Sequence, residues 1–232
     1  MQRLAAICMV LFACATCRSP GADLPIVVNH EPRAVIVVAR QASGACKNAA
    51  AELQEYVKRS TGATLRIITD DVPRGDAAVV AIGATQLAAQ AGLAVRSTDP
   101  EAFRIVRKGN AVYLLGKDEK GYGKYFSYSL GSGVEFATYE FLERVCGVRW
   151  LRPGPKGTFV PERATLVVPD LDIEQAPSYQ YRSSSYWYER KAAKVHDTPY
   201  WHDRVKRERG QLFDWLKHNK INSCWLVPGG HT

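Results

Sequence analysis

Apolar residues along the chain fall into short runs and periodic stretches that predict strands and helices. Residues 34–38 (AVIVV) form a continuous apolar run, which is typical of a strand covered on both faces. Residues 103–107 alternate apolar and basic, and the apolar run 111–115 follows after a turn at 108–110, so the two runs predict a β-hairpin. Other short apolar runs predict strands at 26–28, 65–68, 77–82, 148–151 and 165–168.

Two stretches carry the period of an amphipathic helix. The first lies between Ser43, a suitable N-cap, and Gly62, a suitable stop. The second ends at Gly147, and Ser132 with Glu135 predicts an S-x-x-E capping box at its start. Apolar positions share one face in each helix, at 46, 49, 50, 53, 56 and 57 in the first and at 134, 137, 141, 142 and 145 in the second.

This order of elements predicts an α+β domain over residues 24–175, with one sheet and the two main helices on one face of it. A Pro-bounded linker is expected at 170–177. Next come the parts of one βαβ unit: a strand at 179–187, a helix at 203–218 and a strand at 222–227. Because such a unit needs covering partners on both faces, residues 178–232 are expected to be the incomplete start of a second domain.

The first residues have the layout of a secretory signal peptide. Arg3 supplies the positive charge, residues 4–17 form a short apolar region, and small or turn-forming residues follow up to position 22. Residues 1–22 are therefore expected to direct export to the periplasm or the outside of the cell. A lipid anchor on Cys14 is an alternative, and no other segment is apolar enough to span a membrane.

The distribution of charge argues against a nucleic-acid partner. The formal net charge is +8, but residues 23–177 hold 19 Lys/Arg against 18 Asp/Glu. The excess lies in residues 178–232, with ten basic against five acidic residues. A nearly neutral main body implies no dedicated phosphate-binding face.

Three cysteines lie beyond the leader, and their spacing excludes a standard zinc motif. Cys46 and Cys146 fall on or beside apolar helix faces, where free cysteine behaves as a small hydrophobe. A disulfide between the two is the alternative in an oxidising compartment. Gly131-x-Gly133 lacks the third glycine and the downstream acid of a dinucleotide fingerprint, so no cofactor or metal is expected.

Short motifs follow one another along the chain in a specific order. They are 50–56 (AAELQEY), 81–83 (AIG), 112–116 (VYLLG), 137–143 (ATYEFLE), 147–150 (GVRW), Pro153-Gly154, Val160-Pro161, Tyr181-Arg182, 219–222 (NKIN) and 230–232 (GHT). In this order they resemble the N-terminal region of α-glucuronidase-like glycoside hydrolases and the related accessory domain before the barrel of β-hexosaminidases. The resemblance covers nearly the whole chain after the leader.

The resemblance implies that a (β/α)₈ barrel starts after residue 178 and that the substrate is a carbohydrate. Glycoside hydrolysis normally uses two carboxyl groups, and in these families they lie on later barrel strands. No catalytic residue is therefore assigned to this chain, and by itself it is expected to be inactive. The alternative is a non-catalytic carbohydrate-associated or structural module.

Three residues near the start of the expected barrel are candidates for substrate binding. By analogy with hexosaminidases, Arg182 would contact sugar hydroxyls, the alternative being a surface or interdomain arginine. Trp187 could stack on a sugar face or pack in the barrel. His231 follows the second strand, where loops contact substrate, and the alternative is an ordinary loop histidine.

Overall fold

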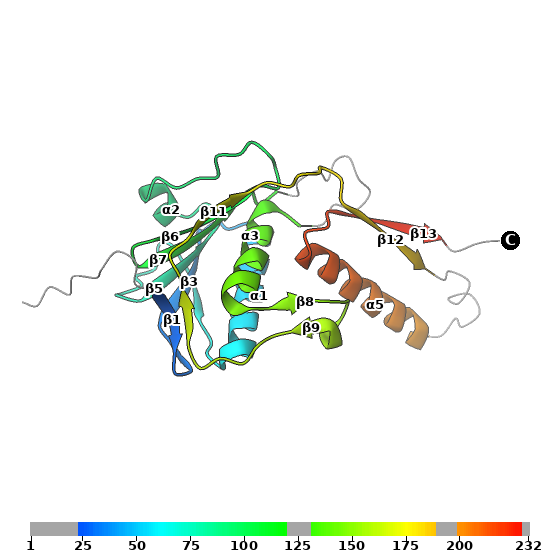
Figure 1. Ribbon diagram of the computed structural model, residues 1–232, viewed down its shortest axis with the longest axis horizontal. Helices are drawn as coiled ribbons and strands as arrows, with labels where there is room; N and C mark the ends of the chain where they lie inside the picture. Colours follow the sequence, from blue (N-terminus) through cyan, green and yellow to red (C-terminus); the bar gives the residue numbers. More distant parts are fainter. Residues whose placement is uncertain (1–22, 120–130, 189–198, 229–232) are drawn as a thin grey trace, which may run out of the picture.

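The computed structural model describes residues 23–119, 131–188 and 199–228. Its centre is a mixed six-stranded sheet (Figure 1). The strands, in spatial order, are β11 (Asp172–Gln175), β6 (Phe103–Lys108), β7 (Ala111–Gly116), β5 (Ala78–Ile82), β3 (Ala34–Val38) and β4 (Arg66–Thr69). Strands β7, β5, β3 and β4 are parallel, whereas β6 and β11 are antiparallel to their neighbours.

The two long helices cover one face of this sheet, as the sequence predicted. Helix α1 (Gly44–Thr61) and helix α3 (Gly133–Phe141) pack on alternate residues of the central strands and form the main core. The opposite face carries a smaller apolar layer, which includes the short helix α2 (Gln86–Gln90) and the segment after it (Figure 1). Burial on both faces explains why the central strands are continuous apolar runs.

Helix α1 begins and ends where its cap residues predicted. The Cys46 amide donates to the Ser43 hydroxyl at 3.2 Å. Gly62 adopts the left-handed conformation, with φ of 76°, and its amide donates to the Lys58 carbonyl at 2.7 Å. Both contacts satisfy backbone groups that a helix end leaves free.

The second long helix begins after Ser132 and stops at Gly147, as predicted, but the bonding at its start and the form of its last turn differ from the prediction. Ser132 makes no capping bond to the backbone; its hydroxyl donates instead to the Glu135 carboxylate at 3.0 Å. After Phe141 the helix continues as a π-turn, η2 (Leu142–Cys146), before Gly147 stops it in the left-handed conformation. The predicted capping box is therefore wrong, and the Glu135 carboxylate also pairs with Lys217 Nζ at 3.3 Å.

A pair of glycines lets α3 start directly against the sheet. A side chain on Gly133 would bring its Cβ within 2.5 Å of the Ala102 carbonyl oxygen, and one on Gly116 would come within 2.2 Å of the Gly133 backbone. Close approach of two backbones is a common reason for glycine. Packing therefore accounts for the second glycine of Gly131-x-Gly133.

The prediction of a single sheet missed three small features. Strands β1 (Leu24–Val28), β2 (Glu31–Pro32) and β10 (Leu166–Val168) form a separate sheet. A hairpin of β8 (Arg149–Trp150) and β9 (Thr158–Phe159) extends from the domain around the short 3₁₀ turn η3 (Pro155–Gly157). The expected linker at 170–177 is largely β11, because pairing with the edge of β6 gives this polar segment its hydrogen bonds.

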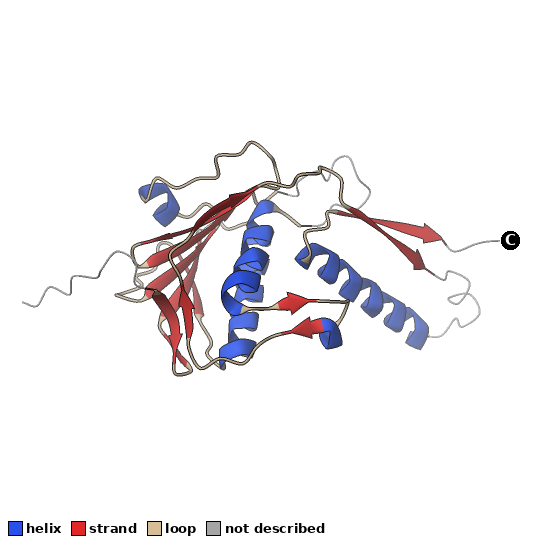
Figure 2. Cartoon of the chain, in the orientation of Figure 1, coloured by secondary structure: helices blue, strands red, loops and turns tan. Residues whose placement is uncertain are grey.

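The last described part is a βαβ unit, as the sequence predicted. Strand β12 (Ser183–Tyr188) and strand β13 (Ser223–Pro228) pair in parallel, and helix α5 (Pro199–His218) connects them in sequence. Figure 2 shows α5 on one side of this strand pair, next to the β8–β9 hairpin. Within the described ranges, no helix has the length and apolar character that a membrane span requires.

Candidate functional site

The richest set of polar side chains lies where the βαβ unit meets the α+β domain. Helix α5 and the turn after it contact α1, α3 and β8, and the two strand starts contact the loop before β6. Three clusters of charged groups and one small pocket lie along this junction.

The first cluster centres on Glu52, at the middle of α1. Its carboxylate pairs with His218 Nε2 at 2.7 Å, and it accepts from Lys217 Nζ at 3.2 Å and from the Tyr139 hydroxyl at 3.1 Å. Burial by itself raises the pKa of Glu52, but His218 and Lys217 hold the pKa below its ordinary value. Burial also acts to lower the pKa of Lys217, and the Glu52 and Glu135 carboxylates raise it above its ordinary value.

Aromatic rings enclose this cluster. The His218 imidazole stacks on Trp150, with ring centres 4.4 Å apart and planes 15° apart. Tyr139 stands edge-on to His218 at 4.6 Å, and Trp150 Nε1 donates to the Tyr56 hydroxyl at 2.8 Å. Burial raises the pKa of Tyr139 well above its ordinary value, so its hydroxyl stays a hydrogen-bond donor to Glu52.

The second cluster holds the starts of both strands of the βαβ unit. Glu101, whose side chain is fully buried, forms an ion pair with Arg182 and accepts from Asn222 Nδ2 at 3.1 Å. The Arg182 guanidinium also donates to the carbonyls of Lys220 at 2.8 Å and Tyr179 at 2.6 Å. Arg182 directly precedes β12 and Asn222 directly precedes β13. The buried Glu101 carboxylate therefore holds the starts of both strands.

The third cluster lies on the π-turn at the end of α3. Lys220 Nζ contacts Glu140 at 2.8 Å and Glu143 at 3.2 Å, and Arg144 also pairs with Glu140. Burial acts to raise the pKa of Glu140, but Lys220 and Arg144 bring it below its ordinary value. π-turns often occur at functional positions. This one contacts the second unit through Lys220.

A small pocket of about 220 Å³ opens beside the first cluster. It lies between the β8–β9 hairpin, the C-terminal part of α5 and the end of α1. Its walls are Tyr56, Arg59, Trp150, Arg152, Gly154, Pro155, Thr158, Gln211, Asp214, Trp215 and His218.

Among the described residues, the structure does not bring those predicted to bind substrate together in one site. Arg182 lies in the second cluster with its donors directed to protein acceptors, as in the interdomain alternative; its contact with sugar stays a prediction. Trp187 is in β12, paired in register with Val227. His231 lies outside the described residues. The prediction for these two residues is unchanged.

Sequence reasoning missed the residues that dominate the junction, chiefly Glu52, Glu101 and Lys217. A signal existed for Glu52, because it stands three residues after Ala49 and four before Tyr56, at the margin of the buried stripe of α1. A charged residue at such a margin often faces a neighbouring element.

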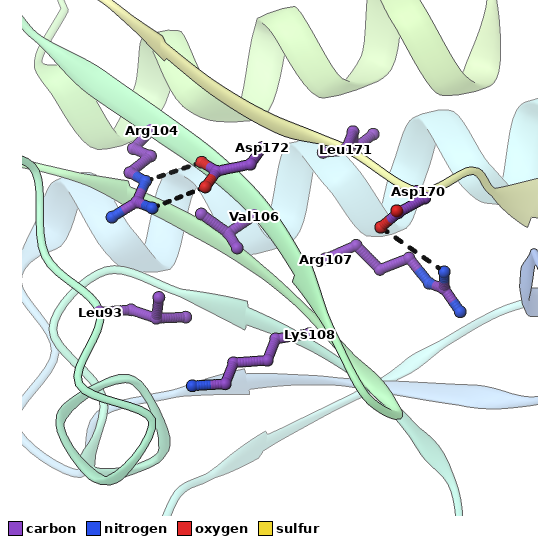
Figure 3. A pocket seen from close by; sticks show the side chains of 8 residues that line it. All are labelled: Leu93, Arg104, Val106, Arg107, Lys108, Asp170, Leu171 and Asp172. Atoms are coloured by element: carbon purple, nitrogen blue, oxygen red, sulfur yellow. Dashed lines mark hydrogen bonds and ion pairs between the residues drawn. The ribbon is translucent and has the colours of Figure 1, made fainter. Parts of the chain in front are cut away.

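A second pocket, of about 400 Å³, lies beside the outer strands of the sheet (Figure 3). Its charged groups are already engaged with one another. Arg104 forms two bonds to Asp172, at 2.8 and 2.7 Å, and Arg107 pairs with Asp170 at 3.8 Å. Lys108 donates to the Ala91 carbonyl at 2.8 Å. The charged groups of this pocket therefore stabilise the edge of the sheet.

The two helix cysteines are buried free thiols, which excludes the alternative of a Cys46–Cys146 disulfide in this structure. Burial raises the pKa of Cys146 to about 12, as expected of an unreactive core thiol. Across the described ranges, no three His, Cys, Asp or Glu side chains come together in a way that could hold a metal ion.

No protein-family profile and no curated protein sequence matches this chain. Among solved structures, a family GH115 4-O-methyl-α-glucuronidase with specificity for decorated arabinogalactans matches 88% of the chain at 19% identity, with a TM-score of 0.58. Streptomyces plicatus N-acetyl-β-hexosaminidase matches 82% at 16% identity with a TM-score of 0.45, and a GH138 enzyme targeting pectin rhamnogalacturonan II matches 85% at 13% with 0.46.

At 19% identity and a TM-score of 0.58, the similarity to the glucuronidase is one of fold. The chain covers 26% of the glucuronidase, 30% of the hexosaminidase and 19% of the GH138 enzyme. This mixed α+β arrangement therefore also occurs within a much longer glycoside hydrolase.

Proposed function

We propose that this chain is the N-terminal part of a secreted glycoside hydrolase, in which the α+β domain supports a catalytic (β/α)₈ barrel that begins with β12, α5 and β13. The proposal draws on the fold similarity to a solved glucuronidase over 88% of the chain. The observation that carries it is the direction in which the βαβ unit is attached.

The α+β domain contacts the unit at the N-terminal ends of its strands. Glu101 bonds to Arg182 and Asn222, the residues directly before β12 and β13. Figure 1 shows the arrowheads of both strands pointing away from the domain. In barrels of this kind the active site lies at the C-terminal ends of the strands. Attachment at the opposite end would leave that face free for substrate.

This geometry also bears on Arg182. Strand β12 has six residues and so is about 20 Å long, which separates Arg182 from the C-terminal end by about that distance. In the proposed enzyme, Arg182 therefore has the role of fixing the barrel to its support. The C-terminal ends of the two strands, at Tyr188 and Pro228, would lie at the catalytic end.

The proposed reaction is α-glucuronidase-like. The enzyme would hydrolyse an O-glycosidic bond in a carbohydrate. Such hydrolysis needs an acid and a base or nucleophile, normally two carboxyl groups at a set separation. Later barrel strands would supply them, and none is assigned to this chain.

The test compares the product of the complete gene with these 232 residues. We expect the complete product to release the sugar from at least one aryl glycoside or uronic-acid-bearing oligosaccharide, and the 232 residues to release none. Hydrolysis by the 232 residues alone would contradict the proposal. A complete product that binds polysaccharide without cleaving any substrate would instead support the non-catalytic module.

A further inference from the structure

We infer that the pocket between the β8–β9 hairpin and α5 binds one acidic sugar residue, at a site separate from the proposed catalytic end. The inference concerns binding and does not require that the protein hydrolyse anything. The floor of the pocket, its rim and its size all fit such a ligand.

The floor of the pocket is aromatic and firmly held. Trp150 and His218 are stacked, and Tyr56 stands edge-on to Trp150 with ring centres 5.4 Å apart. All three are largely buried, and Trp215 joins them through a bond from its Nε1 to the Trp150 carbonyl at 3.0 Å. Aromatic side chains held in this way offer an apolar surface with polar atoms at its edge, which suits the mixed faces of a sugar ring.

The rim of the pocket carries polar groups that have no hydrogen-bond or ion-pair partner among the described residues. Arg152, Gln211 and Asp214 line the pocket, and none of their side chains makes a hydrogen bond or ion pair to another described residue. The charged groups of the three clusters next to them are paired. A guanidinium, an amide and a carboxylate that line one cavity without hydrogen-bonding to the protein are available to bind a ligand.

The rim also carries more positive than negative charge, which favours a negatively charged ligand. Arg59 and Arg152 bring two guanidinium groups to the pocket against the single carboxylate of Asp214. Arg59 is held over the Tyr56 ring, 5.1 Å from its centre. Guanidinium groups bind carboxylates through paired N–H donors, whereas amide and carboxylate groups suit hydroxyls. A ring with both hydroxyls and a carboxylate matches this set.

The volume limits the ligand to one ring. Sites for drug-sized ligands occupy about 300–1,000 Å³. At about 220 Å³ this pocket is smaller, so it would hold a terminal residue and not a stretch of chain. The pocket of Figure 3 is larger, but its arginines already pair with Asp170 and Asp172.

The test is a titration of the full chain, followed by calorimetry and by tryptophan fluorescence. The probes are D-glucuronate and D-galacturonate, with D-glucose and acetate as controls for the ring without the charge and the charge without the ring. We expect saturable binding of at least one uronate, and binding of glucose and acetate at least about tenfold weaker. Fluorescence should change on binding because Trp150 and Trp215 line the pocket.

Two variants separate the roles of the rim charges. Arg152→Gln should weaken uronate binding by about tenfold or more, since a hydrogen bond to a charged group is lost. Asp214→Asn should leave uronate binding unchanged or make it tighter, because a repelling charge is removed while the hydrogen-bonding shape is kept. The matched control is Arg66→Gln, on the exposed strand β4, which should bind like the unaltered protein.

Melting temperatures within the error of the unaltered protein would show that each variant is folded. The inference is overturned if neither uronate binds saturably, if glucose and uronate bind alike, or if Arg152→Gln and Arg66→Gln have the same effect. Because no step depends on catalysis, failure of this test leaves the proposed function untouched, and an inactive complete enzyme leaves this test valid.

Discussion

At the scale of single residues, Glu52 joins the two units through one carboxylate. It bonds to Lys217 and His218 of α5 and to Tyr139 of α3, with its side chain 27% exposed. Substituting Glu52→Gln keeps the shape but leaves two basic groups without their main partner. We expect the free energy of unfolding to fall by about 1–3 kcal/mol in denaturant titrations.

The matched control is Glu55→Gln, three residues further along the same helix and exposed. It should change the free energy of unfolding by less than about 0.5 kcal/mol, as surface substitutions usually do. Equal effects of the two substitutions would show that the charge of α1, and not the Glu52 contacts, matters for stability.

The same carboxylate predicts a pH dependence. The pKa of Glu52 is lowered in the folded protein from its ordinary value of 4.5, so the ionised form stabilises the fold. This contribution is complete above pH 4.5 and is lost as the pH falls through the lowered folded value. Unfolding experiments should show the difference between the protein and Glu52→Gln shrinking from pH 7 to pH 3. A difference that stays constant or grows over this range would contradict the assignment.

At the scale of elements, the packing of α3 on β7 depends on glycine. A Cβ on Gly133 would lie 2.5 Å from the Ala102 carbonyl oxygen, which belongs to backbone and cannot rotate away. We expect Gly133→Ala to lower the free energy of unfolding by about 1–3 kcal/mol, the usual range for overpacking. Gly44→Ala, in the first turn of α1 with nothing within 4 Å, is the control and should be neutral or stabilising by up to about 1 kcal/mol.

Elements set by local chemistry could be predicted from the sequence, and those set by distant partners could not. Ser43 and Gly62 limit α1 because caps act within one turn of the chain. Strand β11 is polar, and it is a strand because β6 lies beside it and Arg104 bonds Asp172. The local pattern at Ser132 predicted a bond to the backbone, whereas its hydroxyl bonds Glu135, which also pairs with Lys217 from α5.

The candidate site follows the same rule at a longer range. Arg182 was identified by analogy with hexosaminidases, but its partner Glu101 comes from a loop of the other unit. Nothing local to either residue relates them, since only the fold brings the loop before β6 against the starts of β12 and β13. A sequence pattern therefore locates the residue more readily than its role.

At the scale of the whole molecule, the Glu101 cluster predicts that the two units can be loosened separately. Arg182→Ala removes the ion pair and the two carbonyl contacts that fix the start of β12. Hydrogen exchange should then become faster in α5 and β13, by about tenfold or more, because local opening there costs less free energy. The amides of α1 should keep their protection, since its core contacts are unchanged.

Lys206→Ala is the matched control for this measurement. Lys206 is an exposed cation on α5, and its loss should leave exchange in α5 and β13 unchanged. If Arg182→Ala raised exchange equally in α1 and α5, the chain would open as one cooperative unit and the cluster would not be a joint. If exchange rose only in α5 and β13, the α+β domain would act as a support that remains folded while the second unit detaches. This second result is the one that the buried, strand-start position of Glu101 leads us to expect.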